Sequence, residues 1–384
     1  LPSEELQSMR TTFVRALPFV AFLTLAACSS SSSGTQPTGD AGTGTGDSGT
    51  AAKTDAEYEA EAVQGMHDQL LTDIDALLVG AKAIQAAAPD DLAGWSDSAK
   101  IDNLKAAWVV ARAAYEHAEG AIAPYYPDID AAIDARYDDF LAALGTTGDN
   151  YLFDGTGVTG MHAIERIVYQ PVTPAAVIEF EATLPGYKAA AFPATAQEAS
   201  DFKSKLCAQL ITDITNLRAQ WVEANLQNVG VAIAYQGLIA LMNEQQEKVN
   251  KAASSEEESR YSQHTMVDLR DNLAGTKVIY GIFQPWIRSK TNASDPTQDG
   301  PTIDTKIQSG FSDLASIYSL ISGDAFPAVP TTWSSESPSA SDLATPFGQL
   351  YTGVHHAVDA NTDGSIVFEM NSAATVLGFP TFTR

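Results

Sequence analysis

The chain has 384 residues, with 22 Lys and Arg against 48 Asp and Glu, so its formal net charge is −26. So acidic a surface repels polyanions, which argues against nucleic acid as a partner and favours cations. Hydrophobic residues make up 45% of the chain, enough for a large core, and only 2 Cys are present. Two cysteines rule out a disulfide scaffold and a zinc site built from several cysteines.

Residues 1–27 are predicted to be a signal peptide. Arg10 and Arg15 supply a short basic region, and the apolar run at 16–27 is too short to span a bilayer. The run ends in Leu-Ala-Ala followed by Cys28, which resembles a bacterial lipobox, whose cysteine is lipidated and becomes the new N-terminus. Ordinary secretion with cleavage near residue 27 is the alternative.

The segment 28–54 is rich in Ser, Gly and Thr and has no apolar periodicity, so it is predicted to be a flexible tether. Together with lipidation at Cys28, it predicts an extracytoplasmic protein that is anchored to a bacterial membrane. Ser29 rather than an Asp follows the cysteine, which in a Gram-negative host favours the outer membrane.

From residue 55 onward the apolar spacing is helical, and strand patterning is almost absent. Apolar residues recur every three or four positions from Tyr58 to Ile84, which predicts one long helix that ends before Pro89. Further helices are predicted at 98–120, 128–144, 161–169, 174–190, 196–225, 227–252, 262–287, 304–321, 341–359 and 366–377. The predicted fold is therefore all-α: one helical domain at 55–384, made of two packed four-helix-type bundles with approximate halves 55–192 and 196–384.

One short stretch occurs twice: QLLTDIDAL at 69–77 and QLITDITNL at 209–217. The two copies share six of nine residues and lie in two long predicted helices. Duplication of one bundle would explain them. Chance similarity between amphipathic helices explains them equally well, so both origins stay open.

The segment 160–165, GMHAIE, contains the first candidate metal ligands. His162 and Glu165 are three residues apart, so on a helix they share a face with Cβ atoms ~5–6 Å apart. An imidazole and a carboxylate suit zinc, iron, manganese or copper. Such pairs are also common on solvated faces. Apolar neighbours predict that this helix is buried, however, and a buried Glu needs a partner.

The helix at 98–120 offers further ligands. Arg112, Glu116 and Glu119 follow one another at helical spacing, and bundle cores hold metals with carboxylates that project inward from several helices. Glu119 and Glu116 are thus candidate ligands, with Arg112 in a supporting role. In the alternative, Arg112 and Glu116 form an exposed pair four residues apart.

These segments resemble the imelysin-like family, which includes the EfeO-type iron-uptake components of the bacterial periplasm. GMHAIERIVY matches the GxHxxE motif of that family, and the stretch from Trp108 to Glu119 is similar to the one that precedes the motif. The segments 258–272 and 377–382 also agree, so the resemblance covers about 55–384. In the EfeO branch a His directly follows Tyr-Ser, whereas this chain has Gln263 there and His264 one place later, which is nearer to the imelysin branch.

The resemblance implies an all-helical two-bundle fold. It also implies that His162 and Glu165 are metal ligands, with Glu119 nearby. Ser262 and Asp268 match a second family pattern as supporting residues, and a helix N-cap is the alternative role for Ser262.

Three functions follow as hypotheses. The favoured one is capture of a divalent or ferric metal ion, iron before zinc, for delivery to an iron-uptake component in the inner or outer membrane. The second is a metallopeptidase, as the family label suggests, although the chain has no HExxH motif to supply two His ligands and a Glu base. The third is a structural or adhesive lipoprotein without a metal. We expect no peptidase activity.

Overall fold

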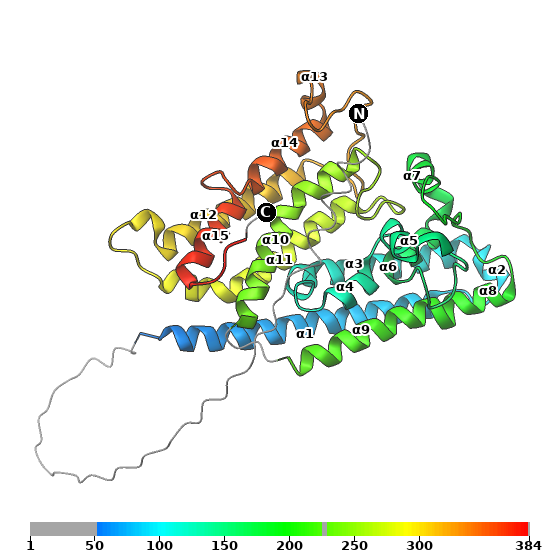
Figure 1. The fold of residues 1–384 in the computed structure, drawn as a ribbon, viewed down its shortest axis with the longest axis horizontal. Coiled ribbons are helices and arrows are strands. Elements are labelled where there is room, and N and C mark those ends of the chain that lie inside the picture. Colours follow the sequence, from blue (N-terminus) through cyan, green and yellow to red (C-terminus); the bar gives the residue numbers. More distant parts are fainter. Residues whose placement is uncertain (1–51, 225–228, 383–384) are drawn as a thin grey trace, which may run out of the picture. The chain divides into compact units, whose positions relative to one another are not determined.

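The structure is a computed structural model, and it describes residues 52–224 and 229–382. The predicted signal peptide, the lipidation site Cys28 and nearly all of the predicted tether lie outside these described residues. Within them the secondary structure is helical and contains no strand (Figure 1), which confirms the predicted all-α class. None of the helices in the described part combines the length and apolar character needed to cross a bilayer.

Two long helices form one side of the core. Helix α1 (Asp55–Ala87) begins at a capping box in which Thr54 and Glu57 bind each other's backbone N–H groups. Its buried stripe repeats every three or four residues, as predicted. Helix α2 (Leu92–Trp95) is a single turn, and α3 (Ser98–Ile122) then packs along α1. The two backbones approach closely because Gly80 has no Cβ, which would otherwise overlap Ala111.

A third long element completes this part. Helix α8 (Ala196–Asp201), the wider turn η3 (Phe202–Leu206) and α9 (Cys207–Val222) run nearly along the predicted 196–225 helix. Helix α9 packs along α1, and the Trp221 indole N–H donates to the His67 carbonyl at 3.0 Å. In both copies of the repeated stretch the Gln side chain donates to the Asp four residues later.

Three predicted helices differ in the structure. The one at 341–359 is divided into α13 (Ala340–Leu343) and α14 (Pro346–Val358), because Thr345 and Pro346 begin a new helix. The one at 128–144 is divided into α4 (Pro127–Asp134) and α5 (Tyr137–Leu144), because Ala135 has an extended backbone with ψ 141°. The one at 174–190 is only α7 (Ala175–Glu181), since Pro185 and Gly186 follow closely. Two single turns, η1 (Gly145–Thr147) and η2 (Gln170–Val172), flank α6 (Gly160–Val168).

The remaining helices form a second group. Helix α10 (Val229–Ala252) packs against α11 (Thr265–Ser289), α14 (Pro346–Val358) and α15 (Ile366–Leu377), and α11 also packs against α12 (Gly300–Ser319). The short elements η4 (Pro296–Gln298) and α13 (Ala340–Leu343) lie between them in the chain. Helix α9 comes from the second predicted half but packs with α1, so the two-bundle division and its origin by duplication stay predictions.

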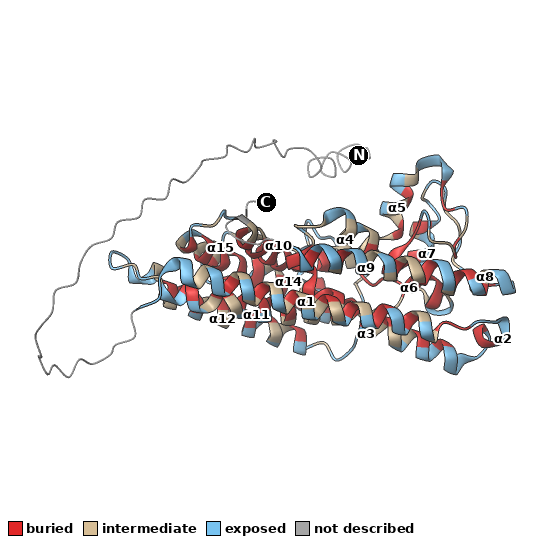
Figure 2. Ribbon diagram, turned by 90° about the horizontal axis from the view of Figure 1, so that it is seen from below, coloured by how far each residue is buried: buried red, intermediate tan, exposed pale blue. Residues whose placement is uncertain are grey.

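Helix α3 also packs against α10 and α11, and this crossing positions the polar residues of the core. A Cβ at Gly237 of α10 would overlap the Gly120 carbonyl, and one at Gly275 of α11 would overlap the His117 backbone. The missing Cβ atoms therefore let the C-terminal half of α3 approach both helices. Figure 2 shows buried residues along the inward sides of the helices, and at this crossing many of them are charged.

Candidate metal centre

Helix α6 contains the motif GMHAIE and lies in the core. All residues of the helix, 160–168, are buried. Gly160 has a positive φ of 82°, and a Cβ there would overlap the Ile133 carbonyl at the end of α4. The first glycine of the motif thus lets α6 begin directly against α4. This contact brings His162 beside Asp134.

His162 and Glu165 contact each other, as their spacing predicted. Nδ1 of His162 lies 2.7 Å from Oε2 of Glu165, and both side chains are buried. The other oxygen of Glu165 accepts hydrogen bonds from the backbone N–H and the hydroxyl of Ser262, at 2.8 and 2.7 Å. Both Glu165 oxygens are therefore occupied within the protein, and the carboxylate orients the imidazole ring.

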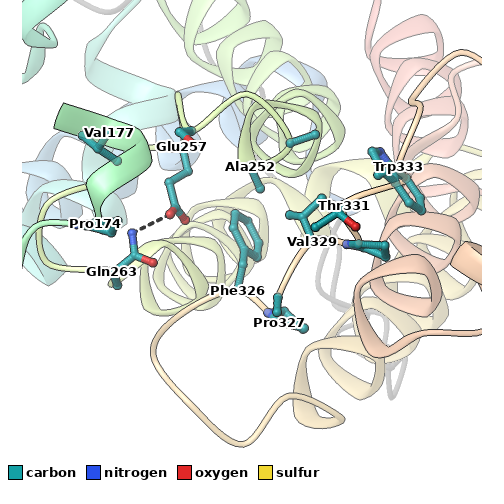
Figure 3. A pocket seen from close by; sticks show the side chains of 14 residues that line it. Pro174, Val177, Ala252, Glu257, Gln263, Phe326, Pro327, Val329, Thr331 and Trp333 are labelled. Carbon is teal, nitrogen blue, oxygen red and sulfur yellow. Dashed lines mark hydrogen bonds between the residues drawn. The ribbon is translucent and has the colours of Figure 1, made fainter. Parts of the chain in front are cut away.

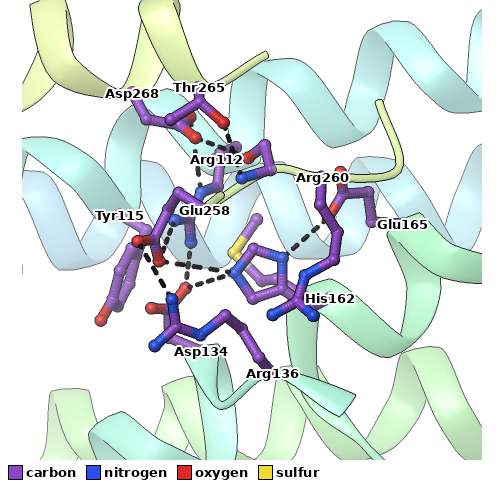
Figure 4. A network of polar contacts seen from close by, with 12 residues as sticks. Arg112, Tyr115, Asp134, Arg136, His162, Glu165, Glu258, Arg260, Thr265 and Asp268 are labelled. Carbon is purple, nitrogen blue, oxygen red and sulfur yellow. Dashed lines mark hydrogen bonds and ion pairs between the residues drawn. The ribbon is translucent and has the colours of Figure 1, made fainter. Parts of the chain in front are cut away.

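The second imidazole nitrogen, Nε2, faces two other carboxylates (Figure 4). It lies 3.4 Å from Oδ1 of Asp134 and 3.8 Å from Oε1 of Glu258, and it has no hydrogen-bond partner among the described residues. One donor atom from each of Asp134, His162 and Glu258 lies within 4.8 Å of the other two. This convergent set, which we call the metal centre, joins the end of α4, α6 and the segment between α10 and α11.

Sequence reasoning missed Asp134 and Glu258 as candidate ligands. Asp134 lies 28 residues before His162, and Glu258 lies 96 residues after it, so no helical spacing connects them. The one available signal was that Glu258 begins the second segment that resembles the family pattern.

Arg112 is at the centre of the surrounding charge network and is not on the surface. Its side chain is 2% exposed and that of Glu116 is 0%, so the alternative of an exposed pair is wrong. The guanidinium pairs with Glu116 and Asp134, lies 3.3 Å from Glu258, and lies 3.6 Å from Asp268. It therefore holds both carboxylates of the metal centre in place.

Glu116 and Glu119 have Lys248 of α10 as their common partner. The buried ammonium lies 3.8 Å from Glu116, 3.3 Å from Glu119 and 3.6 Å from Glu258. The Asn272 amide also donates to Glu119, at 2.8 Å. Neither glutamate contacts His162; each is connected to the metal centre through a shared cation. Their ligand roles, like that of Glu165, stay predictions.

The second segment supports the centre from one side. Helix α11 begins at Thr265 with His264 at its N-cap position, so Ser262 binds Glu165 and does not cap the helix. Asp268 accepts a hydrogen bond from the Ser259 hydroxyl at 2.6 Å and faces Arg112.

The pKa values of the three donors follow from these contacts. Burial and Arg112 lower the pKa of His162, but the nearby carboxylates of Asp134 and Glu258 and the hydrogen bond to Glu165 outweigh them and raise it well above its ordinary value. Burial raises the pKa of Glu258, but Lys248, His162, Arg112 and Arg136, which lies 4.0 Å from its carboxylate, hold it well below its usual range. Burial likewise raises the pKa of Asp134, and Arg112 and His162 lower it overall. The pair of carboxylates is thus ionised and the imidazole protonated near neutral pH.

The network as a whole contains more carboxylates than cations. Burial raises the pKa of Glu116 well above its ordinary value and that of Asp268 to about 6, despite the nearby Arg112. Burial is the main cause of both shifts, and the nearby cations do not fully offset it. The site is therefore electrostatically suited to an added positive ion.

Comparison with known proteins identifies the family. A model of the imelysin family, described as Peptidase_M75, matches residues 62–319. The chain belongs to the imelysin family. No curated protein matches it.

Two solved structures are similar to this imelysin-family chain over most of its length. An imelysin-like protein from Psychrobacter arcticum is 14% identical over 86% of this chain and 99% of its own, with a TM-score of 0.47. A provisionally assigned iron-regulated protein A precursor from Parabacteroides distasonis is 11% identical over 85% of this chain and 96% of its own, with a TM-score of 0.51. At 11% identity the similarity to the second structure concerns the fold alone.

The donor set of this imelysin-family protein fits a transition metal. One imidazole nitrogen and two carboxylate oxygens form a mixed set of the kind that iron, manganese and zinc accept. The His162 Nε2 proton lies where such an ion would bind, so metal and proton would compete for one position. Each carboxylate oxygen has a second lone pair, which leaves Arg112 able to keep its contacts.

Proposed function

We propose that this imelysin-family protein captures a metal ion, iron in the first place, at the Asp134–His162–Glu258 centre. The observation that carries the proposal is the convergence of three donor atoms within 4.8 Å around a buried imidazole nitrogen that has no hydrogen-bond partner. A metal ion in place of the Nε2 proton would bind all three donor atoms at once.

The charges of the buried network favour metal binding over a purely structural role for this site. Five buried or nearly buried carboxyl groups, those of Asp134, Glu116, Glu119, Glu258 and Asp268, surround four cations, Arg112, Arg136, Lys248 and the protonated His162. A divalent or ferric ion would replace the His162 proton and neutralise more of this excess. The two oxygen donors favour iron, a harder ion, over zinc, which remains the second choice.

In this proposal Glu165 does not bind the metal but orients its ligand His162. A carboxylate that accepts the second N–H of a ligating His fixes the ring and raises its basicity. Ser262 holds Glu165 in turn through two hydrogen bonds. Glu116 and Glu119 would set the charge of the centre through Arg112 and Lys248.

We further propose that the protein works outside the cytoplasm, anchored through Cys28 to a bacterial membrane, the outer one in a Gram-negative host. The lipobox and the tether support this location, and the name of the Parabacteroides distasonis protein supports a link with iron. Captured iron would pass to an uptake component in a membrane. Cys28→Ala should release the folded protein into the soluble fraction; a variant that still sediments with membranes would refute the anchor.

The test of the metal centre is anaerobic calorimetric titration of the metal-free full chain, made without a His-tag, with ferrous iron and then with zinc. His162→Ala and Glu258→Gln should each lower the affinity at least about tenfold, or 1.4 kcal/mol. His117→Ala is the matched control, because this half-exposed His lies 3.7 Å from Asp271 and outside the centre. Unchanged titrations for both centre variants would refute the proposal.

The peptidase alternative has its own test. The purified protein should cleave no peptide in a mixed library when zinc, iron or manganese is added. A hydrolytic zinc site needs about three protein ligands, an open water position and a placed general base. Here the candidate for the general base is Glu165, which is not one of the three proposed ligands. Both of its oxygens already form hydrogen bonds within the protein. Turnover that disappears in Glu165→Gln would put the peptidase function first.

A further inference from the structure

A cavity of about 380 Å3 lies beside the metal centre but contains none of its donors. Its walls come from the start of α7, the end of α10 with the segment that follows it, and residues 326–333 between α12 and α13 (Figure 3). This volume lies within the range of small-molecule sites. Most lining side chains are apolar, among them Val177, Phe326 and Val329, and Glu257 is the single charged residue in the lining.

Glu257 is buried, with 7% of its surface exposed, and its carboxylate points toward Gln263 and Phe326 (Figure 3). Oε1 accepts a hydrogen bond from the Gln263 amide at 2.6 Å. Oε2 has no hydrogen-bond partner among the described residues, and burial raises the pKa of Glu257 to about 7. A buried carboxylate oxygen without a partner is unfavourable, so its position at a cavity points to a ligand.

The backbone on both sides of Glu257 is held in a rare conformation. Ser255 and Gln263 have φ values of 62° and 60°, and they are the two residues other than glycine with positive φ in the described part of the chain. Both line the cavity. Strained residues of this kind gather at functional sites. The same segment turns Glu258 toward the metal centre and Glu257 toward the cavity, so the two sites are built separately from adjacent residues.

We infer that this cavity binds a small organic ammonium ion. An N–H donor of the ammonium would pair with Oε2 of Glu257, and the apolar body of the ligand would pack against Phe326, Val329 and Val177. A bound cation favours the ionised form of Glu257, whereas an anion is repelled by it, and a ligand without an N–H or O–H group would leave Oε2 unpaired. The inference goes beyond the proposed metal capture and needs no metal.

The probe for the test is 2-phenylethylamine, which is protonated at neutral pH, and its neutral match in shape is 2-phenylethanol. Both are titrated calorimetrically into the metal-free full chain. We expect saturable binding of the amine, with the alcohol at least about tenfold weaker. Glu257→Gln keeps the shape of the side chain and removes its charge, and it should weaken the amine at least about tenfold.

Two further variants keep the test decisive. Ala253 is exposed at the cavity wall, so Ala253→Trp can block the cavity without replacing a buried residue, and it should abolish amine binding. His162→Ala should bind the amine as the unchanged chain does while losing metal affinity, which separates failure of this inference from failure of the metal centre. Absence of amine binding, equal binding of amine and alcohol, or full amine binding by folded Glu257→Gln and Ala253→Trp would overturn the inference.

Discussion

The two halves of α3 differ in chemistry, and the C-terminal half is also the more deeply buried. The first half, which faces α1, buries Ile101, Leu104, Trp108 and Ala111, whereas the second half buries Arg112, Glu116 and Glu119. Apolar burial stabilises a fold by roughly 25 cal/mol per Å2 of area removed from water. Charged burial requires desolvation, which ion pairs offset only in part. The first half of α3 therefore stabilises the protein, and the second half holds a charged site at the expense of stability.

The largest expected effect is that of removing the central cation. Arg112→Met should lower the free energy of unfolding by about 3–5 kcal/mol, because Asp134, Glu116, Glu258 and Asp268 lose their shared buried partner. Chemical denaturation of the metal-free chain measures the change. Arg218→Met is the control, since its pair with Asp75 is well exposed and should contribute at most about 1 kcal/mol. If the two variants lose the same free energy of unfolding, the buried and the exposed ion pairs do not differ in their contribution to stability.

A substitution in the apolar stripe of α1 should separate stability from metal binding. Leu70 is fully buried, and Leu70→Ala should lower the free energy of unfolding by about 3 kcal/mol through lost burial and a residual cavity. Metal affinity of the folded variant should not change. Denaturation and calorimetry on the same preparation test both statements, and a parallel loss of affinity would show that the two regions are coupled.

Behind the metal centre, Glu165→Gln should lower metal affinity by about 10–100-fold. The amide keeps the size of the side chain but loses the charge that orients and polarises His162. Calorimetric titration measures the affinity, with Glu61→Gln as a control because that side chain is exposed and pairs with Lys53. If the variant binds metal as tightly as the unchanged chain, Glu165 does not support His162 as a ligand.

The smallest expected effect is on pH dependence. The pKa of His162 is raised well above its ordinary value, so below that pKa each bound metal must displace one proton. Asp134 and Glu258 have lowered pKa values and are already ionised near neutrality, so they release no proton there. Affinity should therefore fall by about tenfold for each unit from pH 7 to pH 6, with one proton released per metal. Titrations at several pH values test the slope. A flat profile would mean that the imidazole is not a ligand.

Much of the local structure could be predicted because it depends on residues close together in the chain. The apolar repeat of α1, its limits, and the contact between His162 and Glu165 all follow from helical geometry over one or two turns. The family motif was recognisable for the same reason. Helix breaks were predicted less well: the division after Asp134 occurs within an unbroken helical pattern and without a proline or glycine at the break.

What the sequence by itself determined is the fold class, most helices, the acidic excess and one imidazole–carboxylate pair. Tertiary structure alone decided which charges meet. Asp134 reaches His162 because Gly160 lets α6 begin against α4, and Glu116 and Glu119 reach Lys248 because Gly120, Gly237 and Gly275 lie at the crossings of α3 with α10 and α11. Spacing along the chain says nothing about partners that lie tens of residues apart. Their selection rests on the close packing of helices and on the need of each buried charge for an opposite one.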